Sequence, residues 1–119
     1  MIEQVRAAGL KSLEILRTAG VRMAFGTDLL GASHDLQSEE FLIRAQVQSN
    51  LEVLQSATLI GAELLNQVGV IGEIAAGARA DLLLVDGNPL ADLACLTGQG
   101  ERIPLVMQGG KLRVNELRA

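Results

Sequence analysis

Apolar residues recur at three- and four-residue steps over the first twenty positions, the spacing that gives a helix one apolar stripe. We therefore expect a helix that ends at Gly20, because glycine accepts the left-handed backbone found after many helix C-termini. The short apolar run that follows, residues 21–26, is typical of a strand stopped by a turn. Helix, glycine and strand in this order are typical of a parallel α/β fold. The stripe consists of Ile2, Val5, Gly9, Leu13, Leu16 and Ala19.

Two further helices are predicted before residue 69. Ser38 is suited to cap a helix over residues 39–48, whose first turn carries two acids. Ser49 and Glu52 have the spacing of a capping box and start the next helix. Small side chains further along this helix would let another element approach closely; they are Ala57, Gly61 and Ala62.

After Gly69 the hydrophobic pattern changes to that of strands. Residues 72–77 indicate a short strand and turn. Residues 80–85 are continuously apolar after Asp81, which is typical of a strand buried on both faces. Residues 90–100 show no regular pattern and are interpreted as a connector.

A hairpin is predicted near the end of the chain. Two short apolar runs, residues 105–108 and 112–114, flank a pair of glycines that suits a tight turn. The chain therefore divides into a helical part, residues 1–69 with the strand at 21–26, and a strand-rich part, residues 70–119. This gives an α+β fold of about three helices and four or five short strands.

The composition indicates that this chain does not hide its apolar surface by itself. Hydrophobic residues make up 49% of its 119 residues, yet it has two Phe and no Tyr or Trp. The core must be built from aliphatic side chains, which bury less area each than aromatic rings do. Large exposed apolar patches usually mark a contact with another chain. We therefore expect that the chain forms a homo-oligomer, most simply a dimer, or that it normally packs against a protein segment that is not part of this sequence.

Charge and cysteine content exclude several function classes. The formal net charge is −4 and the ten basic residues are scattered, so no basic stripe for nucleic acid is present. No apolar run approaches the roughly 20 residues needed to span a bilayer. Cys95 is the single cysteine, so no internal disulfide forms and a cytoplasmic location is expected. Nothing around Cys95 suggests a base that would make it a nucleophile.

Asp28 is the first candidate for chemistry. In parallel α/β folds ligands gather at the C-terminal ends of strands, and Asp28 follows directly after the predicted strand 21–26. A carboxylate at such a place binds a metal or accepts a proton from an attacking water. The alternative from the pattern alone is an aspartate that only caps a turn.

Several segments together resemble the amidohydrolase superfamily, more narrowly its imidazolonepropionase-like and Xaa-Pro or Xaa-Arg dipeptidase branch. The resemblance covers about residues 20 to 114. Its motifs are Phe25-Gly26-Thr27-Asp28-Leu29-Leu30-Gly31, Gln37-Ser38-Glu39-Glu40-Phe41, Ile43-Arg44-Ala45, Ser56-Ala57-Thr58, Gly61-Ala62-Glu63-Leu64-Leu65, the segment from Gly72 to Leu90, and Val106-Met107-Gln108-Gly109-Gly110-Lys111.

The resemblance implies a hydrolase that cleaves C–N bonds with one or two divalent metals, commonly zinc, in a (β/α)₈ barrel. Residues 21–26 would be the last barrel strand, and the C-terminal part would belong to a small β-domain. The acid at the position of Asp28 would bind the metal and act as general base. A closed barrel cannot form from this chain, because it holds only the last βα unit; the segment it normally packs against would then be the missing N-terminal barrel segment.

The chain departs from the family in its metal ligands. The family's His-x-His pair and its further histidines lie on earlier strands, whereas this sequence holds one histidine, His34. A rebuilt three-ligand site from Asp28, His34 and one of Glu39 or Glu40 is conceivable, since catalytic zinc usually has three protein ligands. Its spacing does not match the family, so we expect no metal bound by this chain alone.

The acids and the histidine also have simpler interpretations. His34 is expected to lie in a loop, either exposed to solvent or, in a complete enzyme, in contact with substrate. Glu39 and Glu40 are most simply the acids of a helix first turn. Asp81 is expected to bond backbone groups at the entry to its strand.

Three hypotheses follow for function. The first is the C-terminal part of a metal-dependent amidohydrolase, without catalytic competence alone. The second is one half of a split hydrolase that another chain completes. The third is a non-catalytic homo-oligomeric scaffold or interaction module. The resemblance implies that most specificity loops of the family lie outside these 119 residues, so it points to no single substrate.

Overall fold

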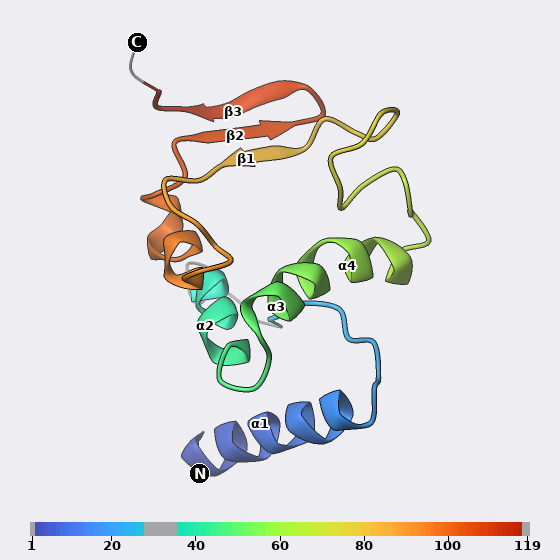
Figure 1. Ribbon diagram of the computed structural model, residues 1–119. Coiled ribbons are helices and arrows are strands. Elements are labelled where there is room, and N and C mark those ends of the chain that lie inside the picture. Colours follow the sequence, from blue (N-terminus) through green and yellow to red (C-terminus); the bar gives the residue numbers. More distant parts are fainter. Residues whose placement is uncertain (1, 28–35, 118–119) are drawn as a thin grey trace.

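The structure is a computed structural model that describes residues 2–27 and 36–117. The α-helices come first along the chain and the strands come later, as Figure 1 shows, with α1 at one end of the molecule and the strands at the other. The expected α+β class is confirmed. The α-helices are α1 (Ile2–Thr18), α2 (Glu40–Arg44), α3 (Asn50–Ala57) and α4 (Leu59–Leu64). The later elements are β1 (Leu82–Leu84), the 3₁₀ helices η2 (Leu93–Leu96) and η3 (Gly98–Gly100), β2 (Leu105–Gln108) and β3 (Lys111–Asn115).

Helix α1 ends as its sequence predicts. Gly20 has a φ of +74°, and the N–H of Val21 donates to the carbonyl of Leu16 over 3.0 Å. This backbone arrangement satisfies a carbonyl that the helix end leaves free, and it needs a residue without a Cβ.

The helical region around residues 49–65 is interrupted at Thr58. The capping box at its start is present: Ser49 Oγ accepts from the N–H of Glu52, and Glu52 Oε1 accepts from the N–H of Ser49, each over 3.2 Å. At Thr58 the backbone leaves helical geometry (φ −122°, ψ −88°) and divides the helix into α3 and α4. Counted as one interrupted helix, α3 and α4 bring the described helices to the expected number.

Gly72 allows the loop after α4 to pass close to the backbone at Thr58, where α3 and α4 are separated. Its φ is +83°, and a Cβ built on it would lie 2.5 Å from the carbonyl oxygen of Thr58 and 3.2 Å from Cβ of Ala62. Only glycine permits such a close backbone approach. The close approach expected at the small residues of this helix is therefore confirmed at Ala62.

The sheet is an open, antiparallel meander with the order β1-β2-β3. Leu83 pairs with Val106, which pairs with Val114 on its other side. The predicted hairpin is confirmed: both Gly109 (φ +57°) and Gly110 (φ +81°) take the positive φ that a two-residue hairpin turn of this kind requires. Asp81 stabilises this turn, because its Oδ1 accepts from the N–H of Gly109 over 2.8 Å.

The core lies between α2, α3 and η2. Val53 and Leu93 are almost completely enclosed, at 0% and 2% exposure. Residues 90–100 are therefore more than the connector that the sequence pattern suggests, since η2 supplies three of the four buried residues of the core cluster. The buried cluster is Val53, Leu93, Cys95 and Leu96, with Phe25, Phe41, Ala45, Leu54, Val85 and Ile103 packed against it.

Four expectations differ from the structure. Residues 21–26 and 72–77 are not strands, because in the described chain no neighbouring strand offers them the backbone partners that a strand needs. Helix α2 is shorter than predicted and is preceded by a 3₁₀ turn at residues 36–39, so Glu39, and not Ser38, occupies its N-cap. Strand β1 is not buried on both faces, because the neighbouring residues Leu83 and Leu84, which point to opposite faces, are 57% and 48% exposed.

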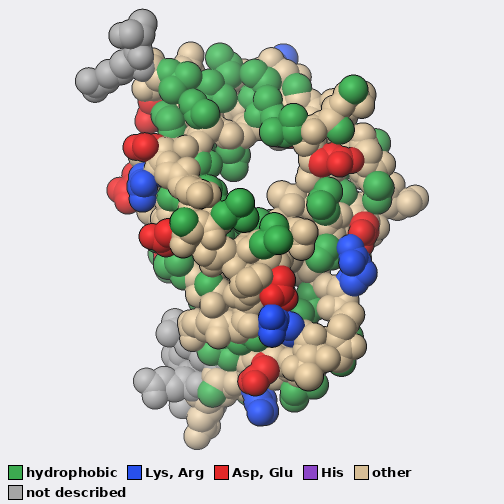
Figure 2. Space-filling view, viewed as in Figure 1, with side chains coloured by type: hydrophobic (Ala, Val, Ile, Leu, Met, Phe, Trp, Pro, Cys, Tyr) green, Lys and Arg blue, Asp and Glu red, His purple; other side chains and the backbone are tan. Residues whose placement is uncertain are grey.

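Much apolar surface is uncovered. The accessible area is 8,435 Å², whereas a compact monomer of 12.6 kDa is expected to expose about 6,200 Å². Figure 2 shows an opening through the molecule between the sheet and helices α3 and α4. Among the described residues, no helix combines the length and the apolar character that crossing a lipid bilayer requires.

Candidate functional site

The segment that leads to Asp28 is fixed between two helices. The N–H of Phe25 donates to the carbonyl of Ser56 at the end of α3 over 3.0 Å. On the other side, Arg44 of α2 donates from Nη2 to the carbonyl of Ala24 over 3.1 Å. These two bonds replace the strand pairing that the sequence predicted for residues 21–26.

An aromatic pair packs beside this segment. The rings of Phe25 and Phe41 have centroids 4.6 Å apart, and the guanidinium of Arg44 lies over the Phe25 ring at 5.1 Å from its centroid. A cation over an aromatic face adds attraction of electrostatic origin, which is stronger where water is excluded. The approach to residue 28 is therefore anchored by packing as well as by hydrogen bonds.

Asp28 and His34, the main candidates from sequence, lie outside the described residues. Glu39 and Glu40 are described, and both lie at the start of α2 as expected. Glu39 is the N-cap residue and makes no capping hydrogen bond with its side chain. Glu40 accepts from Nε of Arg44 over 3.2 Å and thereby forms an ion pair one helical turn apart.

No metal centre is formed within residues 2–27 and 36–117. No group of three or more His, Cys, Asp or Glu in this part of the chain could hold a metal ion. Cys95 is buried, and its Sγ lies 3.1 Å from the carbonyl of Asp92, to which it donates. The described residues therefore do not fit the ligand set of a metal-dependent hydrolase by themselves.

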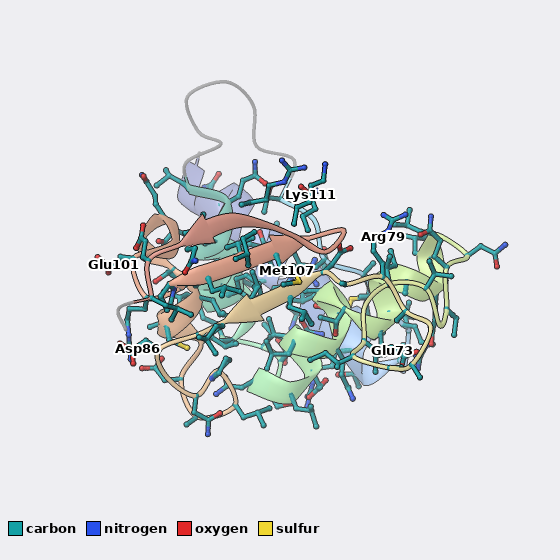
Figure 3. The ribbon with its side chains drawn as sticks, turned by 90° about the horizontal axis from the view of Figure 1, so that it is seen from above. Glu73, Arg79, Asp86, Glu101, Met107 and Lys111 are labelled. Carbon is teal, nitrogen blue, oxygen red and sulfur yellow. The ribbon has the colours of Figure 1, made fainter. Side chains whose placement is uncertain are left out.

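The charged side chains of the sheet region do not converge either. Seen from above in Figure 3, Glu73 and Arg79 lie at one end of the molecule beside α4, while Asp86 and Glu101 lie at the opposite end. Catalysis by paired acids or bases requires the groups to reach one substrate together. Glu73 and Arg79 therefore do not share a site with Asp86 and Glu101.

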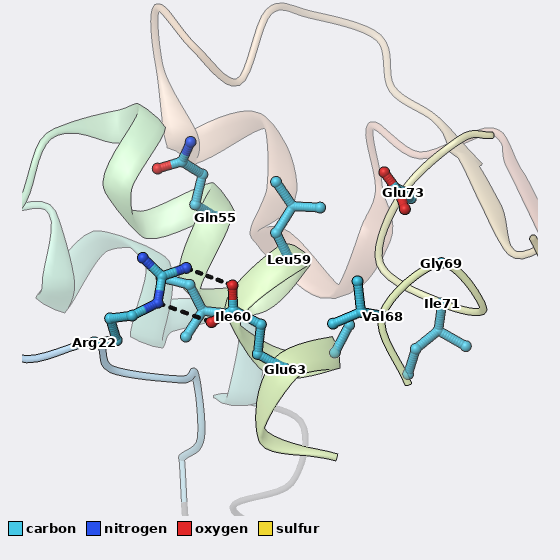
Figure 4. Close-up of a pocket in the computed structure, with 10 residues that line it drawn as sticks. Arg22, Gln55, Leu59, Ile60, Glu63, Val68, Gly69, Ile71 and Glu73 are labelled. Atoms are coloured by element: carbon cyan, nitrogen blue, oxygen red, sulfur yellow. Dashed lines mark hydrogen bonds and ion pairs between the residues drawn. The ribbon is translucent and has the colours of Figure 1, made fainter. Parts of the chain in front are cut away.

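A pocket of about 210 Å³ lies between the segment after α1, helix α4 and residues 68–73. Figure 4 shows Arg22 and Glu63 joined across one side of it and Glu73 on the other. Arg22 donates two hydrogen bonds to the carboxylate of Glu63, over 2.8 and 2.6 Å. These bonds lower the pKa of Glu63, so both groups stay charged and neutralise each other. Arg22 and Glu63 are therefore occupied with each other, and Glu73 is the other acid that lines the pocket.

A second bidentate pair ties α1 to α3. Arg17 donates from Nε and Nη2 to the carboxylate of Glu52, over 2.9 and 2.8 Å. The hydrogen bonds from Arg17 lower the pKa of Glu52 from its usual 4.5 to about 2. This pair is structural, because Glu52 also closes the capping box of α3.

Comparison with known proteins identifies the family of this chain. The amidohydrolase family model matches residues 2–112. The chain belongs to the amidohydrolase family. The resemblance inferred from the sequence motifs is therefore confirmed.

Solved structures of this family superimpose closely on the chain. One is a crystal structure of an amidohydrolase, with 57% identity and a TM-score of 0.92 over 94% of this chain. Another is a prolidase in complex with N-methylphosphonate-L-proline, with 51% identity and a TM-score of 0.86 over 90% of this chain. A curated relative, 5-methylthioadenosine/S-adenosylhomocysteine deaminase of Acetivibrio thermocellus, is 30% identical over 66% of this chain.

The chain spans only part of each of these proteins. It covers 27% of the amidohydrolase structure, 26% of the prolidase structure and 21% of the deaminase. Most of each relative therefore has no counterpart in these 119 residues.

Sequence reasoning missed the anchoring role of Arg44. The motif Ile43-Arg44-Ala45 appeared only as part of the family pattern. Its contact with Ala24, 20 residues earlier, has no local signal. The one hint was an arginine within an otherwise apolar stretch of a short helix.

Proposed function

We propose that this chain is the C-terminal part of a metal-dependent amidohydrolase that hydrolyses C–N bonds, with dipeptides of the Xaa-Pro kind as the leading substrate class. The close superposition on the prolidase structure over nine-tenths of the chain carries the proposal. The deaminase relative also belongs to the class of C–N hydrolysis, so the reaction type is supported more broadly than the substrate.

In this proposal Asp28 is the chain's contribution to catalysis. It follows Thr27 directly, at the end of a segment held by α2 and α3. Asp28 acts as general base, accepting the proton of the attacking water, and is one ligand of a divalent cation, zinc. The described residues hold no further set of ligands, so the cation belongs to the completed enzyme. His34 is the candidate for a contact with substrate.

We also propose that the chain alone does not catalyse the reaction. The excess of accessible area over a compact monomer and the opening seen in Figure 2 support a surface that other protein normally covers. The missing portion comes either from the same longer protein or from a separate chain of a split hydrolase. Cytoplasmic location is part of the proposal and accords with a free, buried Cys95.

A hybrid protein tests the function. This chain replaces the matching C-terminal section of the prolidase that is 51% identical to it, and hydrolysis of an Xaa-Pro dipeptide is measured. We expect the hybrid to be active and Asp28→Asn to lower kcat by about 10²- to 10⁴-fold, the usual contribution of a general base. Glu73→Gln, at the pocket of Figure 4, is the matched control and should change kcat less than twofold. A folded hybrid whose activity survives Asp28→Asn would contradict the proposal.

A second candidate is a homo-oligomeric scaffold. It is favoured by the 64–74 segment, which we define as the apolar side chains exposed at the end of α4 and in the loop after it. Exposed apolar surface of this kind usually marks contact with another chain. The segment comprises Leu64, Leu65, Val68, Val70 and Ile74, exposed by 74, 61, 69, 44 and 88%. The mass of the chain in solution, measured by light scattering coupled to size-exclusion chromatography, tests this candidate.

A further inference from the structure

Arg44 is the most enclosed arginine among the three that form ion pairs in the described chain. Its side chain is 11% exposed, against 46% for Arg17 and 64% for Arg22. Arg17 and Arg22 each donate two hydrogen bonds, from Nε and Nη2, to the carboxylate of one glutamate at the surface. Arg44 divides its bonds between Glu40 on its own helix and the backbone of Ala24.

The bond to Ala24 joins α2 to a segment that lacks secondary structure. Residues 21–27 have no strand partner in the described chain, so their position depends on bonds from neighbouring helices. Arg44 holds the carbonyl of Ala24, and its guanidinium lies over the next ring, Phe25. A planar guanidinium can donate a hydrogen bond and stack on an aromatic ring at the same time, whereas the ammonium group of a lysine has no planar face to stack.

A second bond holds the same place from the opposite side. The N–H of Phe25 donates to the carbonyl of Ser56, a residue that is fully buried and whose Oγ donates to the carbonyl of Val53 over 2.6 Å. Ala24 and Phe25 are therefore fixed by α2 on one side and by α3 on the other. From Phe25, only Gly26 and Thr27 precede Asp28 in the sequence.

The third nitrogen of the Arg44 guanidinium, Nη1, indicates that overall stability does not explain an arginine at this position. Nη1 is buried and has no acceptor in the part of the chain that the structure describes. A buried donor without an acceptor is destabilising, and an apolar side chain of similar volume would avoid this cost. The arginine is thus explained by its two bonded nitrogens rather than by a general gain in stability.

We propose that Arg44 is a positioning residue: by holding Ala24 and Phe25 against α2, it fixes the segment that leads, through Gly26 and Thr27, to Asp28. The catalytic half of this inference rests on the proposed function. Small displacements of a reacting group lower rates strongly, and a shift of about 1 Å can cost about 100-fold. The inference therefore predicts a loss in kcat with little change in substrate binding.

The first experiment measures structure and needs no activity. Amide hydrogen exchange is followed by NMR in the full chain and in Arg44→Met, Arg44→Lys and Arg17→Met. We expect Arg44→Met to speed exchange of the Phe25 amide at least tenfold and Arg44→Lys to speed it less, while the Val53 amide inside α3 is unchanged. Arg17→Met removes an exposed ion pair of similar chemistry and should alter neither amide.

Two results would overturn the positioning role. In one, the Phe25 amide exchanges at the wild-type rate in the Arg44 variants. In the other, the Val53 amide accelerates as much as the Phe25 amide, which would show a general loss of stability. If Arg44→Met yields no folded protein, Arg44→Lys decides, because it keeps the charge and the helix.

The second experiment uses the prolidase hybrid. We expect Arg44→Lys to lower kcat by about 10- to 100-fold and to leave KM within twofold, whereas Arg17→Met leaves both unchanged. An unchanged kcat in Arg44→Lys would refute the link to catalysis. An inactive wild-type hybrid would instead refute the proposed function, and the exchange rates of Phe25 and Val53 would then decide by themselves whether Arg44 fixes residues 24–25.

Discussion

The surroundings of Val53 and those of α1 differ in how far this chain encloses its own apolar residues. Val53 and Leu93 are packed by α2, α3 and η2 on all sides and are almost inaccessible. In α1, by contrast, Ile15 is 58% and Leu16 41% exposed, although the helix has the apolar stripe of a packed helix. Figure 1 shows α1 lying apart at one end of the molecule.

The two regions differ because only the apolar residues around Val53 find their packing partners within the described part of this chain. The region around Val53 has its partners within these 119 residues, and this is also the region that anchors Ala24 and Phe25. Leu16 in the stripe of α1 and the apolar side chains of the 64–74 segment are exposed in this chain. A sequence that covers about a quarter of its solved relatives is expected to show such a division.

Removing a buried side chain from the enclosed region around Val53 should lower the free energy of unfolding most. Leu93→Ala should destabilise the chain by about 2–5 kcal/mol, because it removes buried methyl groups and leaves a cavity. Leu64→Ala, the matched change at a leucine that is 74% exposed, should cost less than about 0.5 kcal/mol. Urea unfolding followed by circular dichroism measures both. Equal effects at the two leucines would show that the contrast between the regions is wrong.

A smaller loss of stability is expected where the backbone of Gly72 passes close to that of Thr58. Gly72→Ala should cost roughly 2–4 kcal/mol, since the backbone has a positive φ and the new methyl would collide with a carbonyl oxygen. Gly77 is the control: its φ of +87° is similar, but a Cβ there meets nothing within 4 Å. Gly77→Ala should therefore cost only about 1–2 kcal/mol. Unfolding curves that coincide for the two variants would rule out the close approach.

A third prediction concerns the uncovered region. If the 64–74 segment contacts a second copy of the chain, Leu64→Glu combined with Ile74→Glu should convert an oligomer to a monomer with little change in unfolding free energy. Light scattering coupled to size-exclusion chromatography measures the mass. Lys111→Glu on β3 tests whether added charge alone has this effect. A wild-type chain that is monomeric at micromolar concentration would refute the scaffold hypothesis.

The smallest effect is the pH dependence of the bridge from α1 to α3. Because the folded pKa of Glu52 is lowered from 4.5 to about 2, the pair stabilises the fold above pH 4.5 and loses this contribution as the pH falls toward 2. Arg17→Met should therefore lower the Tm slightly at pH 6, and the difference from wild type should shrink through this window. Arg113→Met, at an exposed position of β3, should show no such trend. A difference that grows on acidification would have the wrong sign.

The parts of the fold that follow from local chemistry could be predicted from sequence. Gly20 ends α1, Ser49 and Glu52 form the capping box, and Gly109 and Gly110 make the hairpin turn, each because the signal lies within a few residues. The division into residues 1–69 and 70–119 as separate parts stays a prediction.

The parts that depend on distant contacts could not be predicted. Residues 21–26 have the composition of a strand but lack neighbours to pair with, so their backbone bonds go to helices instead. The burial of η2 and the reach of Arg44 to Ala24 arise only from tertiary packing. Within the candidate site, Asp28 and His34 stay predictions, because they lie outside the described residues.

The most direct test of the central claim is the metal content and hydrolytic activity of the purified chain by itself. The proposal predicts less than stoichiometric zinc by elemental analysis and no hydrolysis of Xaa-Pro dipeptides, because the chain contributes one acid to a site that other protein completes. A chain that alone holds one zinc per molecule and hydrolyses a dipeptide, with turnover abolished by Asp28→Asn, would contradict it.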